Sequence, residues 1–180
     1  MSQTQSEKNG VLKSFREDHR NALTQVAKLD EALLGLQFEG KTSAGLHLNQ
    51  IRSVIGFFLT SFAEHTELED QIVFPYLASH IPKIELVLPF LHSEHEALEE
   101  NLKHLEVLIN LFSDKPSEAH QLRIITQLRE VGAYLIYLLR HHIEAERTSI
   151  YQMIDSELRP NERKELKERL NGKAISHVER

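Results

Sequence analysis

The sequence contains no cysteine among its 180 residues, and this absence excludes several kinds of chemistry. Disulfides, iron–sulfur clusters held by thiolates and a thiol nucleophile all require cysteine. Glycine and proline are also scarce, with 7 and 5 residues, and long stretches contain neither. Because these two residues punctuate turns, their scarcity favours long helices over a fold of many short strands.

A long apolar run and a cluster of basic residues are missing as well. No run of about 18 apolar residues occurs, so we expect no membrane span. Residues Met1–Asn9 are polar and lack the apolar centre of a signal peptide. The formal net charge of -6, without a basic cluster, argues against nucleic acid as the main partner. These features, with the lack of cysteine, predict a soluble cytoplasmic protein.

Four long segments carry apolar residues at spacings of three, four or seven, which is the period of a helix with one buried face. Pro75 is expected to kink or shorten the second helix, and Ser117 is the expected N-cap of the fourth. Short connections between such helices predict an all-α fold, an up-down-up-down antiparallel four-helix bundle. The expected helices span about residues 8–36, 43–79, 84–112 and 118–158.

We expect a single domain over residues 1–180, because no linker or shift in composition divides the chain. The bundle would occupy about residues 8–158. After Pro160, a short charged helix is predicted at residues 162–170, and the tail from Asn171 is predicted to be frayed.

Histidine is the unusual component, with 11 residues. On each of the four apolar helix faces, here called stripes, one position that should carry an apolar side chain carries a histidine. Two stripes also have a glutamate four residues after that histidine. A histidine and a glutamate at this spacing lie on one helix face, about 5–6 Å apart. The inward polar residues are His19, His65, Glu69, His95, His142 and Glu146.

Burying these six groups without partners would be costly, because an unpaired carboxylate in an apolar core is very unfavourable. A single inward histidine is more often a hydrogen-bonded core residue. One histidine from each helix, with two inward glutamates, instead favours a bound pair of metal ions. Imidazole and carboxylate suit iron, manganese or zinc, and six ligands exceed the need of one tetrahedral zinc ion.

Other polar residues near the stripes are less clearly turned inward. Glu99 lies at the margin of its stripe, whereas His92 and His141 turn away from theirs, and the sequence leaves open whether any of the three joins the site. The remaining histidines are expected in solvent or at helix ends, and the tyrosines in the core. They are His47, His80, His104, His120 and His177, and Tyr76, Tyr134, Tyr137 and Tyr151.

At these residues the sequence resembles the hemerythrin-like family, also called HHE cation-binding domains, over about Val11–Ile154. The resemblance implies a four-helix bundle with a non-haem, oxo- or hydroxo-bridged di-iron site, in which Zn or Mn could substitute. By this match the four inward histidines would be terminal ligands, and Glu69 and Glu146 would bridge. The motifs that carry it are Asp18-His19-Arg20, His65-x-x-x-Glu69 with Phe74-Pro75, Glu94-His95, and His142-x-x-x-Glu146.

The sequence departs from the oxygen-carrying members of that family. Those have His-x-x-x-His on the third helix, where this chain has Glu99, and an Asp five residues after the last helix-four histidine, where this chain has Glu146 at four. The four-His, two-Glu set is similar instead to iron–sulfur-cluster repair proteins and to an iron-sensing ubiquitin-ligase domain. The cysteine-bearing N-terminal segment of the repair proteins has no counterpart here.

Three functions remain open from the sequence. The first is a di-iron protein, monomer or homodimer, that binds or responds to O2, peroxide or NO as a sensor, scavenger or iron store. The second is a peroxide or NO reductase, or a repair enzyme for iron centres. The third is a regulatory or interaction bundle that metal only stabilises. The sequence names no protein partner.

Overall fold

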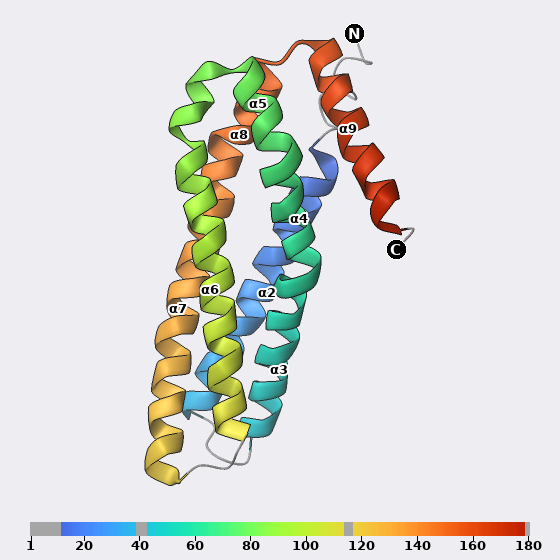
Figure 1. Ribbon diagram of the computed structural model, residues 1–180. Helices are drawn as coiled ribbons and strands as arrows, with labels where there is room; N and C mark the ends of the chain where they lie inside the picture. The colour runs from blue at the N-terminus through green and yellow to red at the C-terminus, as the bar shows by residue number, and fades with distance from the viewer. Residues whose placement is uncertain (1–11, 39–42, 114–116, 179–180) are drawn as a thin grey trace.

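The computed structural model describes residues 12–38, 43–113 and 117–178, with side chains to residue 172. These residues form helices and no strand, which confirms the all-α prediction (Figure 1). The segments are α2 (Lys13–Phe38), α3 (Ala44–Phe57), η1 (Phe58–Phe62), α4 (Ala63–Leu68), η2 (Glu69–Val73), α5 (Phe74–His80), η3 (Pro82–Leu86), α6 (Leu88–Ser113), α7 (Glu118–Thr148), α8 (Ile150–Ser156) and α9 (Pro160–Val178).

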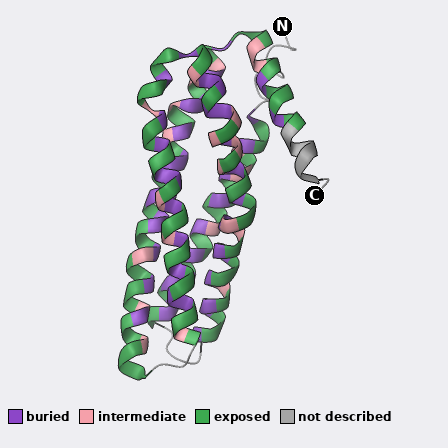
Figure 2. Cartoon of the chain, in the orientation of Figure 1, coloured by how far each residue is buried: buried purple, intermediate pink, exposed green. Residues whose placement is uncertain are grey.

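Four long helical stretches pack as an antiparallel bundle (Figure 1). α2 contacts α3 and α7, and α6 contacts the same two elements, so each helix touches two neighbours around a common core. Buried residues line the inner faces of the helices, and exposed residues cover their outer faces (Figure 2). Within the described residues, no helix is long and apolar enough to cross a membrane.

The second stretch runs from α3 to α5 and contains two π-helical segments, η1 and η2. Such segments insert one extra residue into a helical turn and are frequently found at functional sites. Pro75 is the second residue of α5, close after η2, where the widened turn accommodates the missing N–H, and the helix continues to His80. The helix around Pro75 therefore changes its winding. It is not shortened, since it ends at His80, one residue after the predicted end.

The third and fourth stretches begin or divide differently from the prediction. α6 begins at Leu88, and the preceding turn is a 3-10 helix, because Pro89 fits only the first turn of an α-helix. Ser149 separates α7 from α8, and its hydroxyl donates to the carbonyl of Ala145, which bends the helix. Ser117 is the N-cap residue of α7 but makes no side-chain capping bond.

The C-terminal helix is longer than predicted, because α9 continues to Val178 where a frayed tail was expected from Asn171. Only Gly172 interrupts its helix-forming residues, and one glycine costs about 1 kcal/mol. α9 packs beside η2 through buried Leu166 and Leu170. The hydroxyl of Tyr76 donates to the carbonyl oxygen of Glu162 at 2.9 Å, which fixes the helix to the bundle.

The apolar core consists of two separate clusters along the bundle axis. One includes Ala22, Phe62 and Leu98, and the other includes Phe15 and Leu91. Each of the four helical stretches passes from one cluster to the other. The core is therefore interrupted at one level, and the residues at that level are polar.

Candidate metal centre

The polar level contains the six residues predicted from the stripes, and the structure brings all of them together. On α2, His19 lies between Phe15 of one cluster and Ala22 of the other, and His95 on α6 lies between Leu91 and Leu98. All six side chains are buried: His19, His65, Glu69, His95, His142 and Glu146. They form two groups, each able to offer four ligand atoms within 4.8 Å of one another.

The first group joins α2 with the α4–η2 segment and α7. The Nε2 atoms of His19 and His65 lie 3.0 Å apart. Glu69 Oε1 lies 3.3 Å from His65 Nε2, and Glu146 Oε2 lies 2.9 Å from His19 Nε2. Two nitrogens and two carboxylate oxygens thus face a common point.

The second group repeats this arrangement between α6 and α7. The Nε2 atoms of His95 and His142 lie 3.1 Å apart. Glu69 Oε2 lies 3.6 Å from His95 Nε2, and Glu146 Oε1 lies 3.2 Å from His142 Nε2. Each glutamate therefore turns one oxygen to the first group and the other oxygen to the second, as a carboxylate bridging two ions would.

The buried carboxylates make the clearest case that the site is built for cations. All four oxygens of Glu69 and Glu146 are buried, and each lies 2.9–3.6 Å from an imidazole Nε2 atom, without a well-formed hydrogen bond within the described part of the chain. Such oxygens are costly to bury unless a proton donor or a cation faces them. The facing nitrogens also have suitable spacing, because two ligands about 2.1 Å from one ion and 90° apart lie ~3 Å from each other. The residues present therefore fit a pair of bound metal ions.

Electrostatics in the metal-free protein lead to the same conclusion. Burial disfavours the charged form of His65, but the Glu69 carboxylate and a hydrogen bond to Asp18 outweigh burial and raise the pKa of His65 to about 10. Burial is likewise outweighed at His142, where Glu146 raises the pKa to about 10. Burial would raise the pKa of Glu146, yet His142 and His19 hold that pKa well below its usual value. Positive charge is thus strongly favoured at this level of the bundle.

Three carboxylates without a role predicted from the sequence orient the histidine rings by contacting the ring edge that faces away from the centre. Their partners are the Nδ1 atoms, which donate a hydrogen bond and leave Nε2 facing the centre. Asp18 Oδ2 lies 3.3 Å from His65 Nδ1. Asp70 Oδ1 lies 3.0 Å from His95 Nδ1, and Glu94 Oε2 lies 3.0 Å from His142 Nδ1.

These hydrogen bonds follow the order of the helices. Asp18 on α2 holds the histidine of α4, Asp70 on η2 holds that of α6, and Glu94 on α6 holds that of α7. Each of these carboxylates is adjacent in sequence to one of the six inward residues. A neighbour in sequence lies about 100° around the helix and so faces the next helix. This adjacency is the signal that could have identified them.

Among the described residues, the fourth inward histidine, His19, is contacted at Nδ1 by Tyr151 on α8 instead of by a carboxylate. Its hydroxyl lies 3.2 Å from both ring nitrogens of His19, and the two rings stack with centroids 5.3 Å apart. Burial raises the pKa of Tyr151 far above its usual value, and the charges of Glu69 and Glu146 raise it further. The hydroxyl therefore remains protonated beside the centre. The prediction that Tyr151 and Tyr76 are core residues is confirmed.

The structure also answers which borderline residues join the site. Glu99 is exposed and pairs with Lys103, and His141 is exposed against Tyr137, so neither reaches the six inward residues. His92 stands apart from the six, but its Nδ1 lies 2.8 Å from the same Asp70 oxygen that holds His95.

His47 lies in the first turn of α3, a helix end as predicted, but its side chain is buried, because its ring fills the space opposite Gly35 on α2. The prediction that the other two tyrosines lie in the core was wrong. Tyr134 and Tyr137 are exposed, since they lie one residue beside the buried stripe of α7. His80, His104 and His120 are exposed as predicted, and the side chain of His177 lies outside the described residues.

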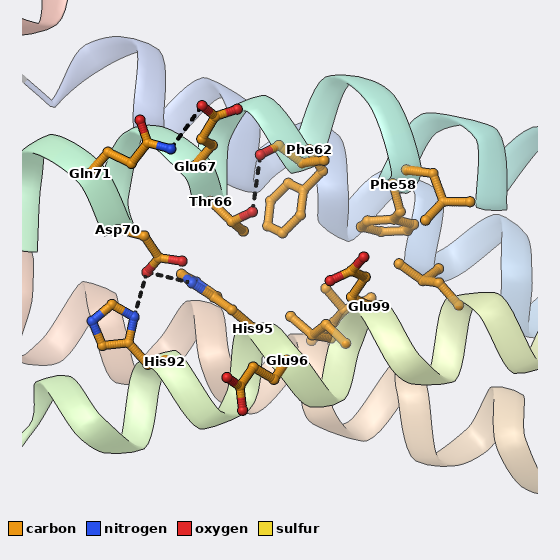
Figure 3. A pocket seen from close by; sticks show the side chains of 15 residues that line it. Phe58, Phe62, Thr66, Glu67, Asp70, Gln71, His92, His95, Glu96 and Glu99 are labelled. Atoms are coloured by element: carbon orange, nitrogen blue, oxygen red, sulfur yellow. Dashed lines mark hydrogen bonds and ion pairs between the residues drawn. The ribbon is translucent and has the colours of Figure 1, made fainter.

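Two clefts approach the centre from opposite sides. One, of about 640 Å³, opens between the η1–η2 region and α6 and reaches His95 (Figure 3). The other, of about 710 Å³, lies between α2 and the α7–α8 region and reaches His19 and Tyr151. A small molecule can therefore approach either end of the polar level.

The sequence was compared with known proteins. No curated protein and no solved structure matches it. The family described as Hemerythrin HHE cation binding domain matches residues 11–154, which contain all six inward residues and exclude α9. This match confirms the resemblance drawn from the motifs. Since it covers far more than half of the sequence, the chain belongs to the hemerythrin HHE cation-binding family.

Proposed function

We propose that this protein holds two non-haem iron ions between its helices and uses them to bind or respond to O2, peroxide or NO. In this proposal His19 and His65 hold one ion, His95 and His142 hold the other, and Glu69 and Glu146 bridge the two. The observation that carries this proposal is the orientation of the two buried carboxylates: each has one oxygen facing one pair of imidazoles and the other oxygen facing the second pair.

The donor set supports iron over copper, because it contains imidazole and carboxylate and no sulfur. Four protein ligands for each ion would complete the shell of tetrahedral zinc but leave six-coordinate iron with open positions. A bound pair of ferrous ions would supply two electrons, one from each iron as both become ferric, and these open positions to a small ligand. Manganese and zinc remain substitutes that the same residues could hold.

The residues of this chain would prepare the site rather than act on the ligand directly. Asp18, Asp70 and Glu94 orient the imidazoles and raise their basicity through Nδ1. The apolar clusters above and below exclude water from the ions. The Tyr151 hydroxyl lies on the His19 side, where it can donate a hydrogen bond.

Metal content and the optical spectrum of the protein from its native source test the proposal. We expect about two irons per chain and, in air, a near-ultraviolet band of an oxo-bridged pair. A stable change of spectrum with O2 or NO, without turnover, would identify a binding protein or sensor. Zinc or no metal would contradict the proposed iron centre.

An enzyme at the same centre is the alternative, and the two clefts favour it because substrate and reductant could approach from different sides. Peroxide or NO reductase activity, or the repair of another protein's iron centre, requires an electron donor. Multiple turnovers with a chemical reductant would distinguish this alternative from binding alone.

A metal-stabilised regulatory bundle is the second alternative. The polar level separates the two apolar clusters, so metal at that level would stabilise the whole bundle. This alternative predicts equal stabilisation by redox-inactive Zn²⁺ and no response to O2 or NO. A cytoplasmic location is the setting we propose for all three functions.

A further inference from the structure

The cleft beside His95 has an acidic rim. Its charged lining residues are Glu67, Asp70, Glu96 and Glu99, the last paired with Lys103, and no lysine or arginine among the described residues lines it. Figure 3 shows Asp70 between the rings of His92 and His95, with Phe58 and Phe62 farther along the cleft. The cleft therefore carries negative charge on the side where the buried centre comes nearest to solvent.

Asp70 connects the exposed part of this cleft to the interior. Its Oδ1 lies 2.8 Å from His92 Nδ1 and 3.0 Å from His95 Nδ1. The side chains are 46% exposed for His92, 33% for Asp70 and 7% for His95, so exposure falls stepwise toward the centre. The other edge of the His95 ring, Nε2, faces His142 and Glu69.

Asp70 and His92 also provide suitable atoms for a cation. A carboxylate oxygen and an imidazole nitrogen are ligands of first-row divalent ions. Their separation of 2.8 Å is close to the ~3 Å between neighbouring ligands of one ion. The edge of the His92 ring packs on buried Phe74, with centroids 5.5 Å apart, which limits its freedom. Two partly exposed protein ligands would hold an ion briefly.

The cleft on the opposite side has the opposite charge. Among the described residues it is lined by Lys13, Arg16, Arg20 and Arg147 and by two carboxylates, those of Glu17 and Asp155, which pair with Arg20 and Arg16. A divalent cation is repelled by such a lining and attracted by the acidic one. Of the two clefts, charge therefore favours the one beside His95 for the approach of a cation.

We propose that the acidic cleft is the route by which a divalent cation reaches the buried centre, and that Asp70 and His92 form a loading site that first holds the ion. This inference rests on the metal centre proposed above. The ion then passes the His95 ring to the six inward residues. Asp70 has two roles, since it also orients His95, so His92 and the acidic rim provide the cleaner tests.

The test measures uptake of Co²⁺ by metal-free protein in a stopped-flow spectrometer at low ionic strength. His92→Ala and Glu96→Gln should slow uptake about three- to tenfold, because charge and ligands at a cleft accelerate the association of ions. The number of ions bound at the end should equal that of the unaltered protein. Glu17→Gln removes the same charge from the opposite cleft and should leave the rate unchanged, as should His104→Ala on the exposed face of α6.

The outcomes separate this inference from the metal centre itself. Uptake at the original rate in both cleft variants would overturn the loading site while leaving the centre intact. Fewer ions bound by the His92→Ala variant would make His92 a permanent ligand, which also overturns the loading role. If the unaltered protein takes up no ion at all, the proposed metal centre itself fails.

Discussion

Replacing Glu94 by glutamine tests whether the carboxylates behind the histidines control metal binding. Glu94 Oε2 lies 3.0 Å from His142 Nδ1, and its side chain is only 7% exposed. Glutamine keeps the size and a carbonyl acceptor but removes the charge. Loss of such a partner lowers metal affinity about 10- to 100-fold, which corresponds to about 1.4–2.7 kcal/mol.

Solvent exposure predicts the order in which loss of the three carboxylates weakens metal binding. Asp70 is 33% exposed and Asp18 is 43% exposed, so water screens their charges more than that of Glu94. Asp18 also lies farther from its histidine, at 3.3 Å. We therefore expect Glu94→Gln to weaken metal binding most, Asp70→Asn less, and Asp18→Asn least.

Competition for Co²⁺ between the protein and a coloured chelator measures these affinities, and Glu100→Gln on the same helix, outside the acidic cleft, is the matched exposed control. The number of ions bound should stay at two in every variant, because no ligand to metal is removed. The reasoning is refuted if Glu94→Gln binds metal as tightly as Glu100→Gln, or if Asp18→Asn has the largest effect.

Three further predictions concern the site and the bundle. His65→Ala should lower iron content and melting temperature together, whereas exposed His104→Ala should change neither; equal effects would contradict the proposed ligand. Gly35→Ala should destabilise the protein by about 1–3 kcal/mol in urea unfolding, since the new Cβ would clash with the His47 ring, while Gly56→Ala, with open space, should stabilise it by up to about 1 kcal/mol. In the metal-free protein, His65 and His142 have a pKa of about 10, so their protonation stabilises the fold fully below pH 6.5 and this stabilisation is lost as pH rises toward 10. The melting temperature should therefore fall between pH 6.5 and 10, and a constant melting temperature would contradict this.

The sequence predicted the bundle and its inward residues well because both depend on local periodicity. A helix repeats every 3.6 residues, so the position of His19 between Phe15 and Ala22 already places it on the buried face. The same reasoning placed Glu69 and Glu146 beside their histidines. Local rules did not predict the break at Ser149 or the π-helical winding around Glu69, because these depend on how the helix meets its neighbours.

The residues that support the centre were less predictable. Asp18, Asp70 and Glu94 are adjacent to the inward residues in sequence, but each acts on a histidine of another helix. His47 is buried only because glycine stands opposite it on α2. Such relations join residues far apart in the chain, and the period of one helix contains no information about the side chain that faces it.

The sequence by itself determined that six polar side chains turn inward in a helical bundle, because amphipathic periodicity fixes the direction of each residue from its own helix. Only the tertiary structure decided which carboxylate oxygen faces which pair of imidazoles, and that Asp70 links His95 to the exposed His92. The rotation and height of each helix relative to its neighbours set those distances, and packing across the whole core fixes both.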